Sequence, residues 1–175
     1  MKLDGKNILM VIPHTQFRDE ELFEPKKILE EEGAKVVIAS TAARTCHGMK
    51  GGTVNAEIAI GEAKADDYEA LVICGGSSVP DFFWNDKKLQ ELVTSMSAAG
   101  KVVAAICLST VVLAKAKLLA DREATVYFLP AAIEELKAAG AKYVKETLLI
   151  HNNIILAEGP PDSRRFGQAI RAALV

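Results

Sequence analysis

The stretch KVVAAICLSTVVLAK, residues 101–115, decides the fold class of this chain. It begins with a run at 101–106 that is apolar after Lys101, and continues, after Cys107, with a helix-like pattern at 108–115. A buried strand followed directly by a helix is the repeating unit of parallel α/β sheets. Cys107 therefore lies near the first free N–H groups and the positive end of a helix, which favour thiolate over thiol.

Cys107 has two interpretations when it is taken alone. Free cysteine is often a small buried hydrophobe with no chemical role. At a junction between strand and helix, the thiol could instead be a nucleophile or a peroxide sensor. Features outside this stretch are needed to distinguish the two interpretations.

The same order of helix, glycine and strand occurs elsewhere in the chain. Three glycines each end a helical pattern and precede an apolar run; they are Gly33, Gly100 and Gly140, before runs 34–39, 101–106 and 141–144. Two more apolar strands are expected at 7–12 and 70–74. This alternation predicts an α/β fold with a mostly parallel sheet and helices on both faces.

Two segments depart from that rhythm. Residues 45–60 contain short alternating stretches separated by glycines, which indicates a hairpin excursion, and 148–157 contain a second hairpin turning at Asn152-Asn153. Asp162 is expected to cap a final helix that ends near Leu174. No linker, repeat or low-complexity segment is visible, so residues 1–175 are predicted to form a single domain.

Composition excludes several classes of function. The chain is 50% apolar and 25% charged, with a net charge of -2 and a pI near 6.0. Those values are typical of a globular protein and argue against nucleic acid or membrane partners. The N-terminus lacks the long apolar region of a signal peptide, and the odd set Cys46, Cys74 and Cys107 fits a reducing compartment. We expect a cytoplasmic protein.

Three segments should meet beyond the carboxyl ends of the strands, where ligands bind in open sheets: 14–21, 74–78 and 107–109. The pair Gly75-Gly76 lets the backbone approach closely and aim an N–H group at a developing oxyanion, or is simply a flexible turn. Glu21 begins a helix in which Pro25 lacks the N–H that would bond the Glu21 carbonyl, so the helix should be distorted. Its carboxyl group could equally be part of a solvated acidic helix start.

Taken together, these segments resemble the PfpI superfamily, which includes intracellular protease I and the parkinsonism-associated deglycase and shares the class I glutamine amidotransferase-like fold. The resemblance rests on three motifs: Asp19-Glu20-Glu21-Leu22 before Pro25, residues 70–76 before Pro80-Asp81, and residues 104–107 before 113–119. It implies a flavodoxin-like three-layer sandwich with Cys107 on a strained nucleophile elbow.

The resemblance also implies roles for particular residues. Glu21 would be the protonated carboxyl group beside the sulfur, donating a hydrogen bond that raises its own pKa and lowers that of the thiol. The backbone N–H groups of Gly76 and Leu108 would form the oxyanion hole. Family members are commonly homodimers or larger homo-oligomers.

The sequence departs from the protease-like members in one respect. They place His directly after the nucleophile, whereas here Leu108, Ser109 and Thr110 follow. The parkinsonism-associated branch also lacks that His, so chemistry by Cys and Glu is not excluded. His14 is a candidate accessory group or a hydrogen-bonded loop residue. Cys74 could condense with an oxidised Cys107 to form a disulfide, but the favoured interpretation is a small buried core residue. No histidine has metal-ligand spacing, so we expect neither metal nor cofactor.

The leading hypothesis is a stress-related, Cys-dependent enzyme of the glyoxalase or deglycase kind. Its substrates would be small reactive carbonyl compounds or their adducts on proteins and peptides. One alternative is an intracellular cysteine peptidase or hydrolase of the protease I type. The other is a non-enzymatic redox sensor that works through oxidation of Cys107.

Overall fold

The computed structural model describes residues 1–175 and is built around a seven-stranded sheet in the order β11-β12-β8-β7-β1-β3-β6. All neighbouring strands are parallel except β11 and β12, which form the predicted C-terminal hairpin. The strands are β1 (Asn7–Val11), β3 (Lys35–Ser40), β6 (Ile58–Ala59), β7 (Ala70–Ile73), β8 (Val102–Ile106), β11 (Leu148–His151) and β12 (Ile154–Ala157).

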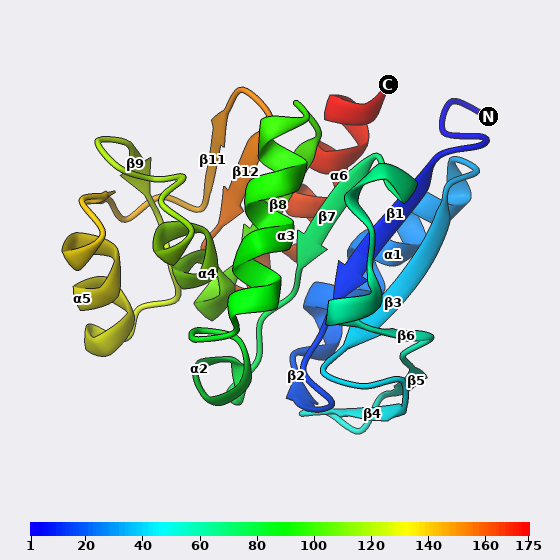
Figure 1. Ribbon diagram of the computed structural model, residues 1–175, viewed down its shortest axis with the longest axis horizontal. Helices are drawn as coiled ribbons and strands as arrows, with labels where there is room; N and C mark the ends of the chain where they lie inside the picture. Colours follow the sequence, from blue (N-terminus) through cyan, green and yellow to red (C-terminus); the bar gives the residue numbers. More distant parts are fainter.

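Helices cover both faces of this sheet (Figure 1). On one face α1 (Asp19–Glu31) packs against α6 (Ser163–Leu174), and α6 contacts β8 and β12. On the other face lie α3 (Lys87–Ala98) and α4 (Thr110–Lys115), with α2 (Val79–Phe82) and α5 (Pro130–Ala138) at the periphery. The arrangement confirms the predicted three-layer, mostly parallel α/β fold.

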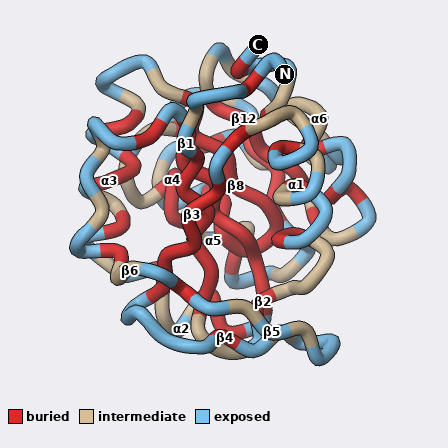
Figure 2. The backbone as a smooth tube through the Cα atoms, turned by 90° about the vertical axis from the view of Figure 1, so that its right-hand side faces the viewer, coloured by how far each residue is buried: buried red, intermediate tan, exposed pale blue.

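The core follows from the apolar strand sequences. Every residue of β7, β8 and β12 is buried, because these central strands carry helices on both faces. Figure 2 shows buried residues concentrated on the central strands and exposed residues on the outer loops and helix surfaces. The buried apolar side chains form one contiguous cluster, which fixes the strand ends that carry the candidate site.

Two sequence expectations are corrected. Residues 141–144 do not join the main sheet, since β10 (Lys142–Tyr143) pairs only with β9 (Glu123–Ala124) in a separate two-stranded sheet. Asp162 precedes α6 but its side chain makes no capping hydrogen bond. The three residues Pro160–Asp162 form a 3-10 turn, and the Ser163 hydroxyl donates to the Pro160 carbonyl instead.

The expected excursion at 45–60 is divided between two sheets. Strands β4 (Thr45–Gly48) and β5 (Thr53–Asn55) form a hairpin that adds to β2 (Thr15–Phe17), whereas β6 pairs with β3 at the edge of the main sheet. This small three-stranded sheet lies beyond the carboxyl ends of β1 and β3. No helix is both long and apolar enough to cross a membrane.

The strand order reverses beside β1. The chain passes from β1 to β3 on one side and later returns to β7 on the other. Loops that leave β1 and β7 therefore diverge at this point, which is where open α/β sheets bind ligands. A bridge between Phe17 and Gly76 ties the two loops together.

Candidate active site

Cys107 lies on the strained elbow that the sequence predicts. Strand β8 ends at Ile106, a 3-10 turn follows at Cys107–Ser109, and α4 begins at Thr110. The backbone of Cys107 has φ 64, a left-handed conformation that is unfavourable for a side chain other than glycine. Such strain costs about 1–3 kcal/mol and persists only where surrounding contacts enforce it.

Three hydrogen bonds between the elbow and distant segments support this conformation. The Trp84 indole N–H donates to the Leu108 carbonyl at 2.9 Å, and the Ser109 hydroxyl donates to the Cys74 carbonyl at 2.6 Å. The backbone N–H of Tyr127 donates to the Cys107 carbonyl at 3.4 Å. Neither Trp84 nor Tyr127 could be assigned a role from the sequence, because nothing in the local sequence links them to residue 107.

The Cys107 sulfur faces a cleft of about 290 Å³. The residue is 5% exposed, so the cleft is its route to solvent. Apolar side chains form most of the wall, together with one charged group, and the ten lining residues are Arg18, Met49, Gly76, Ser77, Pro80, Cys107, Leu108, Tyr127, Leu129 and Pro160. The hollow fits a small ligand more readily than a folded polypeptide.

Glu21 is completely buried beside the sulfur. Its Oε1 accepts a hydrogen bond from the Gly75 N–H at 2.8 Å, whereas Oε2 has no hydrogen-bond partner. A Cβ added to Gly75 would collide with Glu21 Oε1 and would lie 2.6 Å from Cys107 Cβ and 3.1 Å from Cys107 Sγ. Burial raises the pKa of Glu21 to about 8, so the carboxyl group is mostly protonated at neutral pH.

The thiol does not have the lowered pKa that the sequence analysis expects. Burial raises the pKa of Cys107 well above its ordinary value, and the charge of an ionised Glu21 raises it further. The helix after it contributes little, because α4 has only six residues and starts behind the 3-10 turn. A protonated Glu21 removes the charge repulsion and can donate its proton toward the sulfur, so the pair holds two protons at neutral pH and the two groups titrate as a coupled pair.

The two backbone N–H groups proposed for an oxyanion hole, those of Leu108 and Gly76, face the sulfur and lower the pKa of the thiol. Gly76 has φ 145, and a Cβ there would lie 2.8 Å from the Phe17 Cα. The close approach of these two chain segments therefore requires glycine at residue 76. It brings the Gly76 N–H to the position that an oxyanion hole needs.

Cys74 has a structural place that the sequence analysis did not foresee. Its fully buried thiol donates to the Glu21 carbonyl at 3.3 Å. Pro25 lies inside α1 and has no N–H for that carbonyl, so the Cys74 thiol replaces the missing helix bond. The strand register pairs Ile73 with Ala105, which places Gly75, not Cys74, opposite Cys107.

No histidine lines the cleft. The His14 ring packs against Phe82, with ring centroids 4.6 Å apart, and burial lowers its pKa. His47 is exposed in β4, and His151 contacts the Glu123 carbonyl. No group of three or more His, Cys, Asp or Glu side chains is arranged to hold a metal ion.

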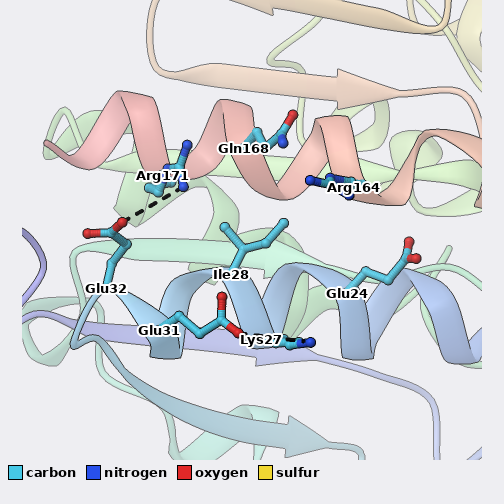
Figure 3. A pocket seen from close by; sticks show the side chains of 8 residues that line it. All are labelled: Glu24, Lys27, Ile28, Glu31, Glu32, Arg164, Gln168 and Arg171. Carbon is cyan, nitrogen blue, oxygen red and sulfur yellow. Dashed lines mark ion pairs between the residues drawn. The ribbon is translucent and has the colours of Figure 1, made fainter.

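A second hollow of about 330 Å³ lies between α1 and α6 and shares no lining residue with the Cys107 cleft (Figure 3). Its lining consists mostly of charged side chains of both signs, one pair of which, Arg171 and Glu32, approaches to 3.8 Å. Its residues are Glu24, Lys27, Ile28, Glu31, Glu32, Arg164, Gln168 and Arg171. It contains no Cys, Ser or Thr side chain, and its one lysine, Lys27, is exposed and paired with Glu31, so the Cys107 cleft is the candidate active site.

Comparison with known proteins supports the same family across the chain. The uncharacterized protein MJ0967 of Methanocaldococcus jannaschii is 46% identical over 172 residues, which cover 98% of this chain and 84% of that protein. The deglycase PYRAB04690 of Pyrococcus abyssi is 32% identical, covering 88% of this chain and 91% of the relative.

A solved structure agrees with these sequence relatives. The ThiJ/PfpI domain protein of Brachyspira murdochii superposes with a TM-score of 0.91 at 33% identity, covering 97% of this chain and 98% of that one. The profile of the DJ-1/PfpI family matches residues 6–173. The chain therefore belongs to the DJ-1/PfpI family.

Proposed function

We propose that this protein is a cysteine-dependent enzyme that acts on small reactive carbonyl compounds or on their adducts with proteins, with Cys107 as the nucleophile. One observation carries the proposal: the elbow presents the Cys107 sulfur to a small cleft between two backbone N–H groups, with the protonated Glu21 beside it. A relative named as a deglycase supports this reaction class.

The geometry suits addition of the sulfur to a carbonyl carbon. A carbon–sulfur bond forms while the π electron pair moves to oxygen, where the Gly76 and Leu108 N–H groups stabilise the negative charge. The thiol proton moves to that oxygen, with Glu21 as the relay. For a 2-oxoaldehyde, Glu21 then moves a proton from the attacked carbon to its neighbour, which leaves the thioester of a 2-hydroxy acid on Cys107. Water adds to the thioester carbonyl, the carbon–sulfur bond breaks, and the 2-hydroxy acid leaves as the thiol regains its proton. The net change is addition of water, so no external oxidant or reductant is required.

A turnover assay with methylglyoxal tests the proposal. Cys107→Ser should fold normally but lose turnover, because a serine hydroxyl ionises far less readily than a thiol. Cys46→Ser is the matched control, since Cys46 lies in β4 and does not line the cleft. Equal turnover in wild type and Cys107→Ser would exclude Cys107 as the nucleophile.

The two alternatives give different results in the same set of assays. A peptidase would cleave a peptide panel, but no imidazole in the cleft could protonate the leaving amine. A redox sensor would show no turnover of either substrate class, and mild peroxide would convert Cys107 to the sulfinate that the two N–H groups can stabilise. Intact mass before and after peroxide detects that product.

A further inference from the structure

Arg18 is the one charged residue among the ten that line the Cys107 cleft. The other lining residues are apolar or uncharged polar groups, together with the cysteine itself. Glu21, directly behind the sulfur, is mostly neutral near pH 7 because burial raises its pKa to about 8. A ligand in the cleft therefore meets a positive charge with no carboxylate on the cleft wall to oppose it.

The Arg18 side chain is held in place with part of its hydrogen-bonding edge unused. Its backbone N–H donates to the Gly75 carbonyl at 2.9 Å, which fixes residue 18 over the glycine pair. Nε and Nη2 donate to the Glu20 carboxylate at 3.1–3.3 Å. Nη1 makes no hydrogen bond, so its N–H beside Nη2 and the second N–H of Nη2 form a free guanidinium edge, which can bind a carboxylate in a bidentate manner.

Glu20 is not devoted to Arg18 alone. The same carboxylate also pairs with Lys50, whose Nζ lies 3.5 Å away, so two cations share one anion. The nearby Asp19 carboxylate is already occupied by the backbone N–H groups of Lys50 and Gly52. The four side chains balance in formal charge, so Arg18 is distinguished by its position, because it alone of the four lines the cleft.

We infer that Arg18 is a substrate-binding residue and that the preferred substrates are small carbonyl compounds carrying a carboxylate, which the free edge of Arg18 binds while Cys107 attacks the carbonyl carbon. The inference rests on the proposed carbonyl chemistry at Cys107 and names its substrate class. The apolar remainder of the cleft holds the carbon skeleton between the two groups.

Alkylation of Cys107 tests the anion site without requiring turnover. Iodoacetate and iodoacetamide differ mainly in the charge of one small group, and Cys46 and Cys74 are both fully buried, so the label on the folded protein falls on Cys107. The rate ratio of iodoacetate to iodoacetamide should fall about ten-fold or more in Arg18→Met, the loss expected for charge-assisted hydrogen bonds.

Two variants serve as controls. One tests the general effect of a positive charge near the cleft, and the other tests the effect of the Glu20 carboxylate that Arg18→Met leaves without its arginine partner. Lys50→Met removes a positive charge next to the same Glu20 but outside the cleft lining, and should change the ratio by less than about two-fold. The double variant Arg18→Met with Glu20→Gln preserves the local charge balance and should show the same loss as Arg18→Met. An unchanged ratio in both Arg18 variants, or an equal fall in Lys50→Met, would overturn the inference.

Turnover then tests the substrate class. The probes are 4,5-dioxopentanoate, a 2-oxoaldehyde that ends in a carboxylate, and the neutral 2-oxopentanal of equal chain length. Wild type should prefer the charged probe in kcat/KM, and Arg18→Met should raise KM for that probe alone by about ten-fold or more. If neither probe is turned over but the alkylation ratio depends on Arg18, the proposed function fails and the anion site stands. Equal kcat/KM for both probes in wild type and variant refutes the substrate class alone.

Discussion

Glu21→Gln should stabilise the protein at neutral pH. Burial raises the pKa of Glu21 from 4.5 to about 8. Between those values the folded protein holds a proton that the unfolded chain has released, so the free energy of unfolding falls as the pH rises. Each pH unit in this window costs about 1.4 kcal/mol, which gives a loss of about 3 kcal/mol by pH 7. Glutamine has the shape of the protonated acid and does not titrate, so it avoids this loss.

Urea unfolding at about pH 5, 7 and 8 measures the effect, with the difference between wild type and variant isolating Glu21 from other titrating groups. The difference should grow with pH in favour of Glu21→Gln. Glutamine can keep the hydrogen bond from the Gly75 N–H, so folding should be retained. Glu24→Gln, an exposed carboxyl group on the same helix, is the matched control and should follow wild type. A Glu21→Gln difference that stays constant across this pH range would refute the assignment of a buried, protonated carboxyl group.

Further predictions concern the groups around Glu21. Gly75→Ala should abolish turnover while the fold survives, because its Cβ would displace the Glu21 carboxyl group and lie 2.6 Å from Cys107 Cβ; activity and circular dichroism measure this. Cys74→Ala should lower the free energy of unfolding by about 1–3 kcal/mol, since the Glu21 carbonyl loses the donor that replaces the Pro25 N–H, whereas Cys74→Ser should recover part of it. Peptide mapping after stoichiometric peroxide should find sulfinate at Cys107 and no Cys74–Cys107 disulfide, because the register places Gly75 opposite the nucleophile. Turnover by wild type should rise with pH as the Cys107–Glu21 pair releases its first proton, and Glu21→Gln should lower turnover across the pH range because the proton relay is lost; initial rates at several pH values measure both.

The order of strands and helices could be predicted because its signals are local. Apolar runs of strand length, helical patterns ending in Gly33, Gly100 and Gly140, and the change of pattern at Cys107 all lie within a few residues of the element that they define. Each of those glycines has a positive φ, as a helix end of this kind requires. The family motifs also predicted which strand ends would meet. The structure brings together the residues expected there, which are Glu21, Gly76, Leu108 and Cys107.

The tertiary structure decided what depends on contacts between distant segments. Local sequence could not show that β10 pairs with β9, that Trp84 holds the Leu108 carbonyl, or that the Cys74 thiol serves the carbonyl left free by Pro25. The direction of the Cys107 pKa shift also depends on the tertiary structure. The position before a helix suggests a lowered pKa and a thiolate, whereas burial by the surrounding elements raises the pKa and favours the thiol. In the sequence, Arg18 is one of several charged residues in its segment, and only the folded structure shows that it lines the cleft. Sequence determined the order of the elements through short-range patterns, whereas charge, burial and hydrogen bonding at the site follow from residues that meet only when the chain is folded.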